Sequence, residues 1–324
     1  MKKFIVCVAI FAAMLVVCAC NGIEWNKETE QTEDIPVVDE LDVSGAELIS
    51  GVNSRYAMLS KINESGEIEV VASKNSSVTM YPASMTKVMT FIVAYENAAS
   101  LEDKTEITKE MKNKYADASR IGIEEGDILT TEQLMYALLL ESDTDAAIAL
   151  AEYVAGSEDE FVKLMNEKCA ELGLVSTNFA NVTGLHDDEH YTTAQEMTKI
   201  FAYALEIDLF RKIITTDEYE TYLDYYKDGV LKNYRITFKN TTISDDKGRL
   251  PKNNVSLTFG EDGRVLGGKT GYTDEAKQCL ALLVTEGGDD YIIITARSST
   301  QKDSAYDSIY ICRNYIPTDE NNPE

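Results

Sequence analysis

The stretch Pro82-Ala83-Ser84-Met85-Thr86-Lys87 places a serine and a lysine three residues apart, and residues 88–93 after it are mostly apolar. This pattern predicts a helix that begins near Ser84. Positions i and i+3 share one face of a helix, so the Ser84 hydroxyl and the Lys87 amine can meet. A serine becomes a nucleophile when a neighbouring base takes its proton, and a buried lysine can be that base because burial disfavours the ammonium form. A serine and a lysine at this spacing also occur by chance, as a cap serine and a surface lysine. The catalytic interpretation therefore needs support from other residues of the chain.

Composition sets limits on the partners of the chain. Its 324 residues are 44% hydrophobic, which is enough for one large core or two modest ones. The net charge of -26 argues against nucleic-acid binding, because phosphate binding needs a basic surface. It also argues against electrostatic adhesion to anionic lipid.

The N-terminus is typical of an export signal, with two lysines before an apolar run at 4–17 that is short for a membrane span. Ala19 before Cys20 resembles a bacterial lipobox. We therefore expect residues 1–19 to be a lipoprotein-type signal peptide and Cys20 to be lipidated, which would anchor the exported chain to the membrane at the cell wall. Cys18 stands where a small or hydroxylated residue is more usual, so an ordinary cleaved signal remains the alternative.

Residues 20–45 are predicted to be an acidic, flexible linker. Positions 24–42 hold eight acidic residues and one lysine, and such a segment repels itself and stays extended. The folded domain is expected at 46–316, followed by an acidic tail at 317–324. The tail is not amphipathic, so any anchor is expected at the N-terminus.

Four cysteines remain after position 19, and none of them forms a C-x-x-C pair. We expect the three in the folded domain to be buried apolar side chains: Cys169, Cys279 and Cys312.

Periodicity predicts strands at both ends of the domain and helices in its middle. The expected strands are 56–60, 67–71, 234–238, 279–284 and 291–295, and the expected helices are 131–140, 145–154, 157–172 and 303–315. This order predicts an α/β (α+β) sandwich with one mainly antiparallel sheet built from both ends of the chain, and with the helices inserted.

Two further stretches could complete a site around Ser84. The turn 141–145 contains Ser142 between two apolar helices and can point side chains into a cleft. The stretch 267–272 is rich in glycine, which permits close approach of a ligand to the backbone. It leads into a strand whose edge can bind an extended peptide.

The chain resembles the serine penicillin-recognising enzymes, because it carries S-x-x-K, an S-x-N-like motif and K-T-G in this order. The motifs lie 58 and 127 residues apart. The finer resemblance, over about 56–316, is to the D-alanyl-D-alanine carboxypeptidases among the low-molecular-weight penicillin-binding proteins. It rests on six stretches in order: Pro82–Lys87, Ala118–Arg120 with Gly126-Asp127, Asp145–Glu152, Gly184-Leu185, His190–Ala194 and Gly268–Thr273.

The resemblance implies a β-lactamase/transpeptidase-like fold with a helical subdomain. It also implies an acyl-enzyme mechanism that needs no metal or organic cofactor. Ser84 would attack the penultimate D-alanine of a peptidoglycan stem peptide, Lys87 would take its proton, and Ser142 would relay protons to the leaving group. β-Lactams, which imitate the D-Ala-D-Ala end, would trap Ser84 as a slow acyl-enzyme.

The K-T-G stretch carries the implied substrate contacts. Lys269 and Thr270 would hold the terminal carboxylate, and repulsion from Lys269 would help to keep Lys87 neutral. Gly271 belongs to the same motif, and the backbone N–H groups of Ser84 and Tyr272 would form the oxyanion hole.

The second motif departs from the family pattern, because Thr144 stands where asparagine is usual. A threonine cannot present an amide oxygen and an NH2 group together. A catalytically weakened protein that only binds peptidoglycan or penicillin is therefore the alternative function. Asp143 or Asp145 could partly substitute for the asparagine, but Asp145 is expected to cap the helix that follows.

Three further features of the sequence bear on other functions. His186 and His190 lie four apart, as in some zinc peptidases, but their segment is acidic and loop-like rather than a helix. A class A β-lactamase would carry a Glu-x-x-Leu-Asn segment between the second and third motifs, and none is present. Arg297 could bind a carboxylate or could be a solvated surface residue.

Overall fold

The computed structural model describes residues 41–63, 66–115, 119–243, 258–259 and 262–317. The predicted signal peptide, most of the predicted linker and nearly all of the predicted acidic tail lie outside these residues, so lipidation of Cys20 stays a prediction. Within the described part, none of the helices has the length and apolar composition needed to cross a lipid bilayer.

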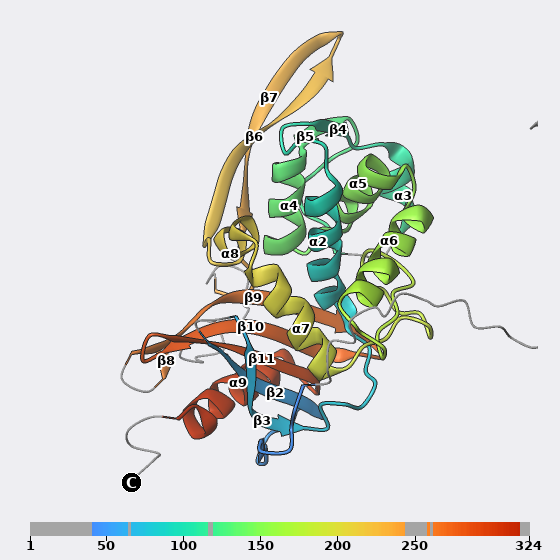
Figure 1. The fold of residues 1–324 in the computed structure, drawn as a ribbon. Helices are drawn as coiled ribbons and strands as arrows, with labels where there is room; N and C mark the ends of the chain where they lie inside the picture. The colour runs from blue at the N-terminus through green and yellow to red at the C-terminus, as the bar shows by residue number, and fades with distance from the viewer. Residues whose placement is uncertain (1–40, 64–65, 116–118, 244–257, 260–261, 318–324) are drawn as a thin grey trace, which may run out of the picture. The chain divides into compact units, whose positions relative to one another are not determined.

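The main sheet has seven strands and joins the two ends of the folded unit (Figure 1). Their order is β1-β3-β2-β11-β10-β9-β8, and all neighbouring pairs are antiparallel except β1 with β3. The prediction of a mainly antiparallel sheet built from both ends of the chain is confirmed. The strands are β1 (Glu47–Leu48), β2 (Tyr56–Ile62), β3 (Ile68–Lys74), β8 (Thr258–Phe259), β9 (Gly263–Thr273), β10 (Lys277–Glu286) and β11 (Asp289–Ser298).

Both faces of this sheet are buried, because successive side chains on a strand point to opposite faces. In β2, Leu59 packs into the core under helix α9 (Gln301–Tyr315), whereas Met58 packs into the core shared with the other helices. Helix α7 (Ala194–Leu205) lies against the second face. The sheet is therefore the middle layer of an α/β/α arrangement.

The remaining helices stack above the α7 face (Figure 1). The predicted helix 131–140 has the bounds that the sequence suggested, because Thr130 and Gln133 form a capping box at its start. Helix α5 is buried from Thr144 to Ala151, as its apolar composition predicts. The helices are α2 (Lys87–Asn97), α3 (Lys109–Lys114), α4 (Thr131–Leu140), α5 (Thr144–Ala155), α6 (Glu158–Glu171) and α8 (Asp208–Ile214).

A second sheet corrects the one-sheet prediction. The predicted strand 234–238 lies in β7, which pairs with β6 rather than with the main sheet. The two strands form a hairpin closed by Asp228 and Gly229, both at positive φ, so their pairing is local. The order of this four-stranded sheet is β4 (Lys104–Glu106), β5 (Asp127–Thr130), β6 (Glu218–Lys227) and β7 (Val230–Lys239).

The cysteine prediction is confirmed for the described residues. Cys169, Cys279 and Cys312 are buried and free. They contribute to the two cores as small apolar side chains.

Candidate active site

Ser84 lies in a short 3-10 turn, η2 (Ala83–Thr86), which leads directly into α2. Ala83 has a φ of +48°, a left-handed conformation that strains any residue with a Cβ. Gly184 packs directly against this turn, and a Cβ at that position would overlap the carbonyl oxygen of Ala83. Within the turn, the Thr86 hydroxyl donates a hydrogen bond to the same carbonyl at 2.8 Å. The position of Ser84 is therefore fixed by its neighbours.

Lys87 is the first residue of α2 and is only 1% exposed. Its Nζ lies 3.2 Å from Ser84 Oγ and donates to the Thr183 carbonyl at 2.6 Å. Burial lowers the pKa of Lys87 to about 7, and the negative charge of Asp143 opposes this shift. Near neutral pH a large fraction of the amine is thus unprotonated and can accept a proton from the serine.

A cleft of about 390 Å3 opens in front of this pair. Strand β9 borders it, and a Cβ on Gly271 would lie only 3.0 Å from the Ser84 amide nitrogen, so glycine permits this close approach. From Val265 onward the outer edge of β9 has no strand partner among the described residues. The lining residues are Ser84, Ser119, Ser142, Thr270, Gly271, Tyr272, Gln278 and Gln301.

Ser142 reaches the cleft from the turn between α4 and α5. Its φ of +60° is unusual for a serine, and the residue is 6% exposed. Its Oγ is buried and has no hydrogen-bond partner in the described part of the chain. A buried hydroxyl without a partner is unfavourable, so a ligand that supplies a polar atom here would be stabilised.

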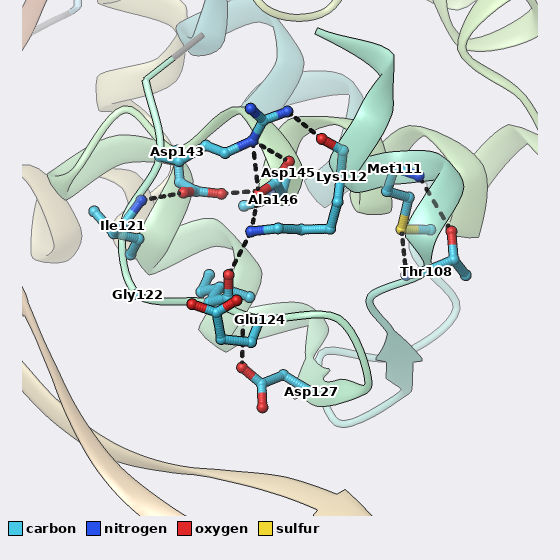
Figure 2. Close-up of polar contacts among 12 residues, drawn as sticks. Thr108, Met111, Lys112, Ile121, Gly122, Glu124, Asp127, Asp143, Asp145 and Ala146 are labelled. Carbon is cyan, nitrogen blue, oxygen red and sulfur yellow. Dashed lines mark hydrogen bonds and ion pairs between the residues drawn. The ribbon is translucent and has the colours of Figure 1, made fainter. Parts of the chain in front are cut away.

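Asp143, next to Ser142, is the residue that caps α5. Its carboxylate accepts hydrogen bonds from the Ala146 N–H at 2.8 Å and the Ile121 N–H at 2.9 Å (Figure 2). Burial raises the pKa of Asp143 to about 6. These bonds tie the 119–121 segment to the turn that holds Ser142.

The prediction that Asp145 caps α5 is wrong. The helix begins at Thr144, and a cap must precede the first helical residue with an extended backbone, as Asp143 does. Asp145 is instead fully buried, 2.9 Å from the Lys112 Nζ (Figure 2). Its carboxylate also lies 3.0 Å from the Arg120 Nε.

Two predicted site residues are buried and do not line the cleft. Thr144 is 1% exposed, and its N–H donates to the Ser119 carbonyl at 3.0 Å. Lys269 is fully buried in β9, and its Nζ donates to the Thr270 carbonyl at 3.0 Å. The low pKa of Lys87 is caused by burial, so the repulsion expected from Lys269 is not required for it.

The comparisons with known proteins identify the family of this chain. A family model described as peptidase S11, D-alanyl-D-alanine carboxypeptidase, matches residues 49–300. The chain belongs to this family. The recognition made from the six sequence stretches is therefore confirmed.

Several relatives of this S11 family member have names that state an activity. It is 32% identical to the D-alanyl-D-alanine carboxypeptidase DacF of Bacillus subtilis, over 72% of this chain and 56% of that protein. It is 30% identical to DacA of Escherichia coli K12, over 68% of this chain and 50% of that protein. The chain thus spans about half the length of these two relatives.

The fold is confirmed by solved structures. The crystal structure of the Streptomyces K15 DD-transpeptidase superposes with a TM-score of 0.69 and 26% identity, covering 80% of this chain and 95% of that one. The predicted β-lactamase/transpeptidase-like fold, with a helical subdomain over a mainly antiparallel sheet, is therefore correct.

Sequence reasoning did not select three of the residues that line the cleft in this S11 protein. Ser119 stood in one of the matched stretches without a role, and Gln278 and Gln301 had no motif around them. Gln278 lies on β10 and Gln301 begins α9, so only tertiary packing brings them to Ser84. Of these three residues, only Ser119 could have been indicated from the sequence, because it lies within a matched stretch.

The remaining candidates lie elsewhere. Arg297 is exposed and lines a different cavity. His190 is buried, with Nε2 2.7 Å from the Thr86 hydroxyl and Nδ1 accepting from the Ala180 N–H at 3.1 Å. Both ring nitrogens are thus engaged in hydrogen bonds within the protein.

Proposed function

We propose that this protein is a serine-type D-Ala-D-Ala carboxypeptidase, a hydrolase that removes the terminal D-alanine from peptidoglycan stem peptides and is acylated by β-lactams. The observation that carries the proposal is the Ser84–Lys87 pair, with 3.2 Å between Oγ and Nζ and a lysine pKa of about 7 at the mouth of an open cleft. Family membership supports the same substrate class.

Ser84 is the proposed nucleophile and Lys87 the proposed base. Lys87 Nζ takes the hydroxyl proton while Ser84 Oγ attacks the carbonyl carbon of the penultimate D-alanine. The C–N bond breaks, and the terminal D-alanine leaves after its nitrogen receives a proton. Ser142 is suited to pass that proton, because its buried hydroxyl has no other partner among the described residues. Water then hydrolyses the ester and frees Ser84.

The substrate is expected to lie along β9. An extended peptide can pair with an open strand edge through backbone hydrogen bonds. The Thr270 side chain and the positive charge of Lys269 are assigned to the terminal carboxylate, and the N–H groups of Ser84 and Tyr272 to the oxyanion. The close approach of Gly271 to the Ser84 nitrogen supports this pairing of β9 with the serine turn.

We also infer that the enzyme works outside the cytoplasm, where cell-wall peptides are found. The lysines, apolar run and Ala19-Cys20 pair at the N-terminus support export and lipid anchoring at Cys20. Metabolic labelling with a radioactive fatty acid would test this, and Cys20→Ala should abolish the label while leaving export intact. A label retained by the variant would exclude this anchor.

The experiment that tests the activity is mass spectrometry after exposure to penicillin, with release of D-alanine from a pentapeptide measured in parallel. We expect one penicillin adduct on the peptide that contains Ser84, no adduct on Ser84→Ala, and an unchanged adduct on the exposed control Ser299→Ala. An adduct without any D-alanine release would overturn the carboxypeptidase and favour the weakened binder suggested by Thr144. Absence of the adduct, or its mapping to another peptide, would overturn the role of Ser84.

A further inference from the structure

A second cavity, of about 400 Å3, lies beside the segment that leads into the Ser84 turn. It shares no lining residue with the Ser84 cleft. Its walls come from the 79–81 segment, the ends of β2 and β11, the 188–191 loop and the turn between β9 and β10. None of the roles proposed above uses this cavity.

A β-bulge brings Arg297 to this cavity. Gln278 pairs with Ser298 but Leu280 pairs with Thr295, so two residues of β11 face one residue of β10. Arg297 has a φ of +57°, and both it and its neighbour Ala296 line the cavity, whereas successive residues of a regular strand would face opposite sides. Bulges commonly redirect a side chain in this way.

Arg55 is held next to Arg297 by the backbone. The Arg55 N–H donates to the Ala296 carbonyl at 3.1 Å, at the point where β2 begins beside β11. The Asn75 side chain fixes the Arg55 carbonyl from the other side at 2.9 Å. Two arginines on adjacent strand ends thus line one cavity.

The charges around this cavity are not neutralised by one another. Within the described residues neither Arg55 nor Arg297 forms an ion pair, although the chain carries a net charge of -26. Asp188 and Glu275 line the same cavity. Asp188 lies 3.6 Å from His186 Nε2, and Glu275 is in none of the ion pairs of the described residues. Charged groups of both signs around one space favour a ligand that carries both signs.

We propose that this cavity binds the zwitterionic end of an amino acid or short peptide. The carboxylate would lie between Arg55 and Arg297, which can each offer two parallel N–H donors, and the ammonium group would face Asp188 or Glu275. Tyr81 and Tyr191 supply flat walls for the rest of the ligand. The ligand class follows from the charges of this cavity and does not depend on the activity proposed for Ser84.

The test is an NMR titration of the full chain with D-alanine, followed at the side-chain Nε–H signals of Arg55 and Arg297. The Gly271 N–H signal reports separately on any binding in the Ser84 cleft. We expect saturable shifts of both arginine signals, and binding at least about fivefold weaker for acetate or methylammonium, which each carry one of the two charges. Arg297→Gln, read at Arg55, and Arg55→Gln, read at Arg297, should each bind about tenfold more weakly.

Arg264→Gln is the matched control, because Arg264 is an exposed arginine on β9 outside this cavity. It should bind D-alanine as the unmodified chain does, and thermal unfolding should show that each variant is folded. If one arginine variant fails to fold, the other gives the same test. The proposal is overturned if the arginine signals do not shift up to about 100 mM D-alanine. It is equally overturned if acetate alone binds as tightly, or if both folded arginine variants bind without loss.

Discussion

Lys87 differs from an ordinary lysine because it is buried at the start of α2, which lowers its pKa to about 7. If the neutral amine is the base, the rate constant for acylation by penicillin should rise as the pH increases through about 7 and level off above it. Lys87→Arg keeps the positive charge at all these pH values, so acylation should slow by about 100-fold or more. Stopped-flow measurement of acylation between pH 5.5 and 8.5 would show this. A flat profile, or a fast Lys87→Arg variant, would exclude this base.

Asp143 gives a second prediction at the scale of one residue. Its negative charge raises the pKa of Lys87 against the effect of burial. Asp143→Asn keeps an oxygen for the Ala146 N–H and removes the charge, so the pH midpoint of acylation should move to lower pH. The variant Asp224→Asn, at a carboxylate on β6, should leave the midpoint in place. A midpoint that stays or rises in Asp143→Asn would show that this carboxylate does not act on Lys87.

At the scale of elements, a buried charge cluster joins α5 to α3 and to the loop before β5 (Figure 2). Asp145 is fully buried, and its partners Lys112 and Arg120 are 19% and 21% exposed. Removing the negative charge of the shared carboxylate weakens the interaction with both cations in a partly buried setting. Asp145→Asn should therefore lower the free energy of unfolding by about 2–4 kcal/mol.

Urea unfolding at pH 7 measures this loss. The matched control is Asp224→Asn, which breaks an exposed pair with Lys104 and should cost less than about 1 kcal/mol. Equal losses in the two variants would mean that burial gives the Asp145 cluster no special weight.

Elements also show where sequence reasoning works and where it stops. Helix α4 was predicted with its bounds because its cap and its apolar spacing are both local. Strand β6 was missed because its charged and tyrosine residues give no clean alternation, although its partner β7 follows directly in the chain. The residues of the site also fall into a group that the sequence predicts and a group that it does not. Motifs indicated Ser84, Ser142 and the β9 residues, whereas the two glutamines of the cleft depend on tertiary packing.

At the scale of the whole molecule, His190 connects the loop after α6 to the serine turn. The Ala180 N–H is a donor, so Nδ1 must be the acceptor and Nε2 must carry the proton that faces Thr86. Thr86 in turn donates to the Ala83 carbonyl beside Ser84. A neutral His190 therefore completes a chain of hydrogen bonds that spans about one hundred residues of sequence.

The hydrogen bonds of His190 make the stability of the protein depend on pH. Burial lowers the pKa of His190 to about 4, whereas a histidine in the unfolded chain titrates near about 6.5. Between these values only the unfolded state takes up the proton, so the contribution of His190 to stability is complete above about 6.5. It is lost as the pH falls toward about 4, by about 3 kcal/mol in all.

Urea unfolding at several pH values should show His190→Gln less stable at pH 7, with a smaller further loss on acidification. His186→Gln, at an exposed site, should keep the original slope. If the slope is as steep in His190→Gln, the acid sensitivity comes from other groups, and the protonation state inferred for His190 is wrong.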